Sequence, residues 1–517
     1  MGILLCIVSP MNRQPKGQEG FFWAIFPAAL AVFYVFVFNS GYGYDALEFL
    51  TIGRSLRDGY SFFTFSPHKP WALYYLVDLF FSSGFPADHY GVSLLITLIV
   101  GAILAATFLI SKRLFDVKMA LLSCVFVFLS AIFMELNFLE AEGLSFLSGL
   151  LAFYVIHSGL QQKRKLGLVL GGFLIGMGSW FKIITMVYFP AAALFLVFWN
   201  YREGTFLSMR SVKQKTLLLS GLLAAMAIPC LLFFRHGDLR TYLYWTYYFP
   251  FFGYQTFTFW ASKLYTRLSW FFVLFISALG LSFTKGVRNR LYSDDGCVFI
   301  LFMGVFPLVL LFKSQAPHYL FPAAGFLSIF IAIVFIFALN KTERSSPFGA
   351  LAMSLVLIGS GMAMGIYLFL SGKISKIKGL SALRDYSYEQ HISAAIDPLI
   401  PDGGHALFFR DSASLYWISH RYPNVPFLWF DDWATLRLKQ DPDALLKALS
   451  DPALQLVEFN PAAPGDTDVQ DFFLRNHPDN RRILETFELA LRTRFTPSTI
   501  HIPPYMFWVR KRAAPSS

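Results

Sequence analysis

Two acidic residues follow the first apolar segment of the chain. Asp45 stands in the sequence Gly-Tyr-Gly-Tyr-Asp-Ala-Leu-Glu, which places Glu48 three residues later. A carboxylate where the chain leaves a membrane can take the proton of a hydroxyl while that oxygen attacks an activated carbon, such as the anomeric carbon of a sugar. The same position is also typical of a solvated loop acid, so position alone leaves both interpretations open.

Basic and aromatic residues farther along the chain are candidates for binding a phosphate group. His68 and Lys69 lie in the same connection between two prolines. A cation at the interface can stabilise a departing phosphate, although a lysine also extends to lipid head groups for solvation alone. Lys182 lies among apolar residues, where a charge is costly and indicates function, unless the segment ends there and reaches water. His318 and Tyr319 open another apolar segment and are candidates for contacts with a phosphate or a sugar hydroxyl.

Acidic residues also crowd one short connection, at Glu135, Glu140 and Glu142. They are candidates for a second catalytic acid or for metal ligands. We favour a solvated turn for them, which would also discourage inversion of the chain in the membrane.

The positions of these residues depend on how the chain crosses a membrane. The chain has 517 residues, of which 56% are hydrophobic and only 15% charged, with a mean hydropathy of +0.53. Several apolar segments fall short of the ~20 residues that span a bilayer, so their ends are approximate. Trp180 and Lys182 interrupt the stretch 166–199 and predict two helices there. We expect about eleven transmembrane helices, at 21–38, 90–110, 119–134, 143–158, 166–180, 183–199, 216–234, 270–284, 296–312, 318–339 and 349–370.

The distribution of basic residues predicts the orientation of the chain. One set of connections holds most of the lysines and arginines, whereas the short connections of the other set hold only Lys182 and Lys313. Loops rich in lysine and arginine face the cytoplasm. We therefore expect residues 1–20 inside and residues 372–517 outside. The net charge of +11 then reflects membrane topology, and no nucleic acid is expected as a partner.

Two long external connections, at 39–88 and 235–268, complete the predicted membrane domain of residues 21–371. The first contains apolar residues at helical spacing, including Phe49 and Ile52, which predicts an amphipathic helix lying on the membrane surface. The region after the last span alternates strand-like and helix-like runs and predicts a small α/β domain.

The ordered set of motifs resembles the GT-C superfamily of membrane glycosyltransferases. The motifs are Tyr-Asp-x-x-Glu, then Pro-His-Lys-Pro-Trp-x-Leu-Tyr-Tyr, the short acidic connection, Trp-Phe-Lys followed after seven residues by Pro, and His-Tyr-Leu-Phe-Pro. They are similar to the protein O-mannosyltransferases and lipid A aminoarabinose transferases of glycosyltransferase family 39 over most of 21–340. The C-terminal region is similar to the periplasmic domain of bacterial members. The family has Asp-Glu side by side, whereas Ala46 follows Asp45 here.

The resemblance implies an inverting glycosyltransferase that uses a polyprenyl-phosphate sugar donor on the outer face of a bacterial inner membrane. It implies that Asp45 is the general base and that Lys69 binds the phosphate. The family often has Arg-Tyr where His318 and Tyr319 stand. Expected partners are the donor, membrane lipid and an acceptor protein, lipid or glycan. No cofactor is expected, although a divalent metal bound by the acids of 135–142 is left open.

Two other classes of protein share this membrane layout. A polytopic transporter would show inverted repeats and ionisable residues at mid-membrane, and the sequence shows neither. A polysaccharide polymerase or ligase has a similar layout, but the acidic first connection argues against it. The sequence does not specify the sugar, the acceptor or the oligomeric state. It also leaves open whether Met1 or Met11 is the start.

Overall fold

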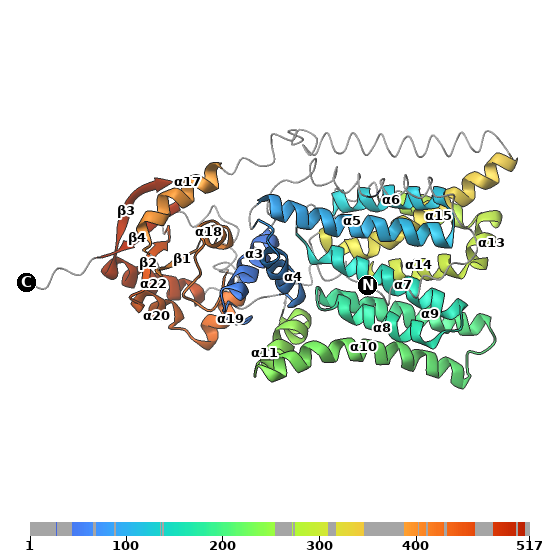
Figure 1. Cartoon of the computed structure of the whole chain (residues 1–517), viewed down its shortest axis with the longest axis horizontal. Helices are drawn as coiled ribbons and strands as arrows, with labels where there is room; N and C mark the ends of the chain where they lie inside the picture. The colour runs from blue at the N-terminus through green and yellow to red at the C-terminus, as the bar shows by residue number, and fades with distance from the viewer. Residues whose placement is uncertain are drawn as a thin grey trace, which may run out of the picture.

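The computed structural model consists of a helical bundle and a C-terminal region with a β-sheet, with two helices between them (Figure 1). It describes Pro27 and residues 44–65, 69–86, 89–134, 136, 139–253, 271, 274–308, 317–345, 387–401, 403–409, 412–428, 432–460, 479–502 and 505–511.

The bundle is built mainly from apolar helices that run roughly parallel to one another (Figure 1), whereas the short basic helix α13 (Lys285–Ser293) is bent by 91° relative to the helix that follows it. In the described part of the chain, five helices are long and apolar enough to cross a membrane, or six if a bent pair counts as one span. Apart from Pro27, the expected segments 21–38 and 349–370 lie outside the described residues, so the total of about eleven stays a prediction. The helices are α5 (His89–Leu114), α6 (Val117–Phe133), α7 (Ala141–Gln161), α8 (Lys165–Gly178), α9 (Tyr188–Arg202), α10 (Met209–Arg235), α13 (Lys285–Ser293), α14 (Asp295–Val305) and α15 (Phe321–Ser345).

Glycines allow α8 to pack closely against its neighbour α10. A Cβ added at Gly172 would collide with the backbone carbonyl of Leu218, and one at Gly221 would collide with the carbonyl of Val169. Small residues permit such close backbone approach between helices in a membrane. The position of α8, and of the turn that follows it, is therefore fixed by backbone-to-backbone contact.

The stretch 166–199 forms two helices, as predicted. Helix α8 ends at Gly178, and a 3₁₀ turn, η1 (Ile183–Val187), leads into α9. Pro229 lies inside α10 and has no N–H to donate to the carbonyl of Ala225, four residues earlier. The indole Nε1 of Trp180 donates to that carbonyl at 3.1 Å. The carbonyl that Pro229 leaves without a helical donor in α10 is thus the acceptor that holds the turn after α8.

Helices α3 (Tyr44–Arg57) and α4 (Ala72–Ser82) lie between one end of the bundle and the C-terminal region (Figure 1). The expectation that the first of them lies on the membrane surface is wrong. Its apolar residues Phe49 and Ile52 are buried, but so are its polar residues Glu48, Thr51 and Ser55. The reason is that α3 packs against α4 and also against the C-terminal region, so neither face is left for lipid or water.

The C-terminal region holds a four-stranded sheet of order β1-β2-β4-β3, in which β1 and β2 are parallel and the other neighbours antiparallel. Some of its apolar residues, such as Leu407 and Val457, form a separate hydrophobic core, whereas others, such as Phe408 and Leu456, belong to the core that continues into α3 and the bundle. The strand-like runs at 406–409 and 454–459 overlap β1 and β2, whereas the β3–β4 hairpin was not predicted. The elements are α17 (Ser387–Ile396), β1 (His405–Phe408), α18 (Ser412–Ile418), α19 (Asp432–Gln440), α20 (Ala444–Ser450), β2 (Leu454–Glu458), α22 (Asp479–Arg494), β3 (Phe495–Ile502) and β4 (Tyr505–Arg510).

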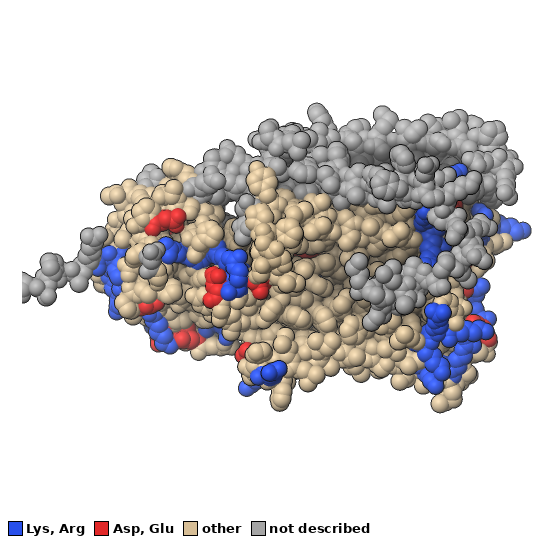
Figure 2. All heavy atoms as spheres, in the orientation of Figure 1, with Lys and Arg blue, Asp and Glu red and all other residues tan. Residues whose placement is uncertain are grey.

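Lysine and arginine gather at the end of the bundle that faces away from the C-terminal region (Figure 2). Lys112 and Arg113 end α5, Lys165 begins α8, and Arg202 ends α9. Between the two ends the visible surface is almost free of charged side chains (Figure 2).

Candidate active site

A buried ion pair lies at the end of the bundle nearest α3 and α4. Nζ of Lys182 is 2.8 Å from Oε1 of Glu142, and the two side chains are 6% and 0% exposed. The ammonium group also lies 4.3 Å from the ring centroid of Tyr319, in the 3₁₀ turn η4 (Pro317–Leu320). The alternative in which Lys182 merely reaches water is therefore wrong. Three segments far apart in the sequence meet at this cation.

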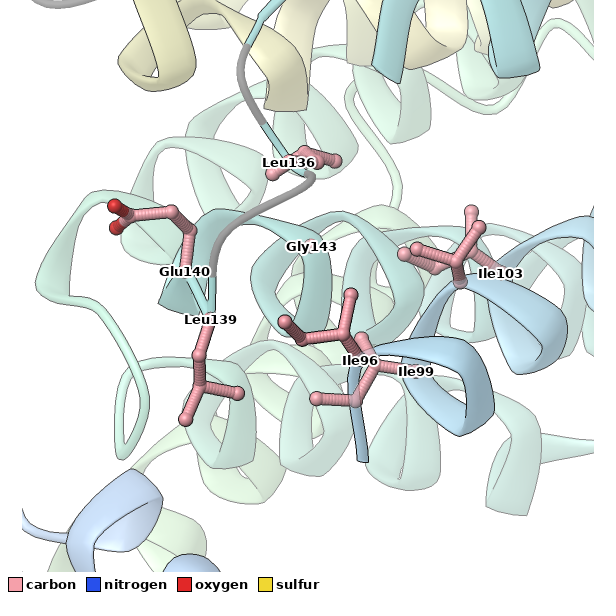
Figure 3. Close-up of a pocket in the computed structure, with 8 residues that line it drawn as sticks. Ile96, Ile99, Ile103, Leu136, Leu139, Glu140 and Gly143 are labelled. Carbon is pink, nitrogen blue, oxygen red and sulfur yellow. The ribbon is translucent and has the colours of Figure 1, made fainter. Parts of the chain in front are cut away.

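The acidic connection before α7 is part of the same cluster. Glu140 directly precedes the helix and Glu142 lies in its first turn, where the helix dipole favours a negative charge. Both side chains are buried, so our preferred interpretation of a solvated turn is wrong. Glu140 also borders an apolar pocket between α5 and α7, and its carboxylate points away from the isoleucines of α5, Ile96 and Ile99 (Figure 3). Glu135 lies outside the described residues.

Lys69 joins this cluster from the connection before α4. Its side chain is buried, with 8% of the residue exposed. Burial, together with repulsion from Lys182, lowers its pKa to about 7 against the opposing attraction of Glu140 and Glu142. Its Nζ lies 5.4 Å from the ring centroid of Phe49 in α3. Two cations and two carboxylates are thus gathered in one buried site.

A backbone contact explains how Lys69 and Lys182 come together. The amide N–H of Ala72, at the start of α4, donates to the carbonyl of Trp180 at 3.0 Å. The indole rings of Trp71 and Trp180 lie 5.5 Å apart. The connection that carries Lys69 is therefore tied to the turn that carries Lys182, and Trp180 ties that turn to α10.

Helix α3 brings its acidic end to the same part of the molecule. Asp45 is the second residue of α3, and its side chain lies outside the described part of the structure. One turn later, Glu48 is buried and accepts a hydrogen bond from the hydroxyl of Tyr74 in α4. Tyr74 was not singled out from the sequence, although it stands in the Lys-Pro-Trp-x-Leu-Tyr-Tyr run.

The remaining candidates from the sequence cannot be placed in this geometry. His68 lies outside the described residues, and so does the side chain of His318, whose backbone belongs to η4. Their roles stay predictions. The described residues of the cluster are Glu48, Lys69, Tyr74, Glu140, Glu142, Lys182 and Tyr319.

Comparison with known proteins finds a likeness to membrane glycosyltransferases in one stretch of the sequence and in the fold. Residues 66–234, which include Lys69, Glu142 and Lys182, match the model of the dolichyl-phosphate-mannose-protein mannosyltransferase family. ArnT from Cupriavidus metallidurans, in a crystal structure bound to undecaprenyl phosphate, is 11% identical with a TM-score of 0.62, covering 96% of this chain and 98% of ArnT. The chain has the GT-C fold of these membrane glycosyltransferases.

A second solved relative shares the GT-C fold. The oligosaccharyltransferase AglB from Archaeoglobus fulgidus, in complex with an inhibitory peptide and a dolichol-phosphate, is 9% identical with a TM-score of 0.53, covering 96% of this chain and 75% of AglB. No curated protein sequence matches the chain. Together with its apolar helices, the GT-C fold makes this an integral membrane protein.

Proposed function

We propose that this GT-C protein transfers a sugar from a polyprenyl-phosphate carrier to an acceptor protein, lipid or glycan. The observation that carries the proposal is the buried Lys69 beside the Lys182–Glu142 pair, at the end of an apolar bundle. A lipid-linked phosphate would reach this depth with its chain in the membrane and its head group at the cluster.

The electrostatics of the cluster favour an added anion. Burying charges costs free energy, and the lowered pKa of Lys69 shows that the surrounding carboxylates do not fully offset the desolvation and the repulsion from Lys182. A donor phosphodiester would add one negative charge beside the two cations. Lys69 would then regain its proton affinity, and both lysines would stabilise the phosphate as it leaves.

In the proposed reaction Asp45 is the general base. It takes the proton of the acceptor hydroxyl while that oxygen attacks the anomeric carbon from the side opposite the phosphate. The new C–O bond forms as the bond from the anomeric carbon to the phosphate oxygen breaks, and the electron pair leaves with polyprenyl phosphate. The configuration at the anomeric carbon inverts. Glu48 is assigned no proton transfer, because the hydroxyl of Tyr74 already donates to it.

The charge distribution supports an outward-facing site. The basic end of the bundle is opposite the cluster, and basic ends face the cytoplasm. The cluster and the C-terminal region then lie outside, in the periplasm if the membrane is a bacterial inner membrane. ArnT and AglB were captured with undecaprenyl phosphate and a dolichol-phosphate, which supports a lipid phosphate as the donor here.

Binding of undecaprenyl phosphate to the purified protein, measured by native mass spectrometry, tests the proposal. We expect Lys69→Met and Lys182→Met to lose most of the binding. Lys165→Ala is the matched control, since this lysine is exposed at the opposite end of the bundle, and it should bind normally. Equal binding by all these proteins would show that the cluster is not a phosphate site.

A further inference from the structure

Arg54 joins the last turn of α3 to the C-terminal region. The residue is 5% exposed. Its Nη1 donates to the carbonyl of Trp417 at 2.9 Å, and its Nη2 donates to the carbonyls of Tyr416 at 2.7 Å and Arg421 at 3.2 Å. Its Nε donates to the hydroxyl of Tyr422 at 3.1 Å. One guanidinium group thus donates to three backbone carbonyls, two in the last turn of α18 and one in the segment after it.

A second set of contacts strengthens the same junction. The guanidinium carbon of Arg54 lies 5.0 Å from the ring centroid of Tyr422. The hydroxyl of Tyr422 in turn donates to Asp58, directly after α3. The ring of Tyr422 stacks on Phe65 with centroids 5.7 Å apart. The end of α3 and the chain beyond it are therefore held by one short segment of the C-terminal region.

The geometry separates this junction from the phosphate-binding cations. Arg54 and Asp45 are nine residues apart on α3, about 13–14 Å along the helix axis. Lys69 and Lys182 belong to other segments, which the contact between Ala72 and Trp180 ties to each other. A shift of α3 would move Asp45, and with it the Phe49 ring beside Lys69, while the backbone tie between these two segments stays in place.

We propose that Arg54 is a positioning residue, through which the C-terminal region holds α3 in the place that transfer requires. The expected effect on the rate of transfer rests on the proposed function. Losing the junction should slow the transfer step and leave donor binding unchanged. The C-terminal region should stay attached, because the guanidinium of Arg437 in α19 independently lies 5.4 Å from the ring centroid of Trp245.

Three variants test the inference. Arg54→Lys keeps the charge but cannot reproduce the planar fork, and we expect kcat to fall about 10- to 100-fold, the scale of a small misplacement of a catalytic group. Tyr422→Phe keeps the ring and removes one hydroxyl, and kcat should fall about 3- to 10-fold. Arg57→Ala is the control, because that side chain is 39% exposed and its ion pair with Asp58, at 3.8 Å, is an exposed one that contributes little. It should behave as the unaltered protein.

The measurements are kcat and donor KM for release of polyprenyl phosphate, with binding of undecaprenyl phosphate by native mass spectrometry. A fall in kcat with unchanged binding supports the positioning role. Normal kcat in Arg54→Lys and Tyr422→Phe, or a loss of binding that matches the loss of kcat, overturns it.

Hydrogen exchange separates this inference from the proposed function. The amides of α3 should exchange faster in Arg54→Lys and Tyr422→Phe than in Arg57→Ala, while those of α8 and α10 stay unchanged. Unchanged exchange in α3 overturns the proposed junction even if transfer is observed. If the unaltered protein shows no transfer with any donor, the proposed function fails. Faster amide exchange in α3 of the two variants would still show that Arg54 and Tyr422 keep α3 in place.

Discussion

The lowered pKa of Lys69 leads to a prediction about pH and donor affinity. Burial and Lys182 bring this pKa to about 7 in the unliganded protein, and a bound phosphodiester should raise it again. Binding then requires the protonated lysine, and the apparent Kd is the intrinsic Kd divided by the protonated fraction. That fraction is about 0.9 at pH 6, about 0.5 at pH 7 and about 0.1 at pH 8, so the apparent Kd should rise about tenfold between pH 6 and pH 8.

The probe for this measurement is a polyprenyl methyl phosphodiester, which cannot transfer a sugar. A diester keeps one charge throughout, whereas a phosphate monoester has a second pKa near 6 that would mix with that of the lysine. Binding in nanodiscs is measured between about pH 6 and pH 9 by competition with a fluorescent analogue.

Lys69→Arg is the control, because arginine stays charged throughout this range. It should bind the probe with little dependence on pH. If the unaltered protein binds equally well at all these pH values, Lys69 does not contact the phosphate as a titrating cation.

The free energy of unfolding should change with pH in the opposite direction to the affinity for the donor. Between pH 7 and about 10.5 the unfolded chain binds more protons at this lysine than the folded chain, so the free energy of unfolding should rise with pH there.

Further predictions concern the bundle. Lys182→Met and Glu142→Gln should each lower the free energy of unfolding by about 3–5 kcal/mol, because each leaves a buried charge without its partner. The double variant should lose less than the sum, and additive losses in thermal melts would argue against a coupled pair. Trp180→Phe should cost about 1–3 kcal/mol and weaken binding of undecaprenyl phosphate, since the carbonyl freed by the proline in α10 loses its donor; normal binding would show that the turn needs no such anchor. Gly172→Leu should prevent folding, whereas Gly280→Ala should give a normal size-exclusion profile, because an added Cβ there meets no atom of the described residues within 4 Å.

The helices of the bundle were predictable because hydropathy along the chain reports burial in a membrane directly. The division of 166–199 into two helices followed from a lysine that a single span would have placed at mid-membrane. The anchor of that turn was not predicted. It depends on Trp180 meeting one carbonyl of α10, and sequence spacing contains no signal for such a contact.

The candidate site was predicted in composition but not in arrangement. Lys182 was chosen because a charge among apolar residues is costly, Lys69 as a cation at the interface, and Glu142 as one of three acids in a short connection. Their pairing depends on which helix ends meet, and this is set by backbone packing between helices. The acids before α7 were therefore mistaken for a solvated turn.

The burial of α3 illustrates a second limit of sequence patterns. A helix with one apolar face shows the same periodicity on a membrane surface and against another part of the protein. Arg54 looks like an ordinary basic residue at a helix end, yet its partner carbonyls lie more than 360 residues away in the sequence. Nothing in the local sequence indicates that partner.

The most direct test of the proposed reaction compares the unaltered protein with Asp45→Asn. Each is incubated in nanodiscs with a panel of polyprenyl-phosphate-linked hexoses and pentoses, and with membranes from cells lacking the gene as the source of acceptor. Release of polyprenyl phosphate is followed by mass spectrometry. We predict that the unaltered protein releases it from at least one donor and that Asp45→Asn is slower by about 10²- to 10⁴-fold, the usual loss on removing a positioned base, with unchanged binding of undecaprenyl phosphate. Equal rates in the two proteins would contradict the assignment of Asp45 as the base, and no release from any donor would contradict the proposed transfer itself.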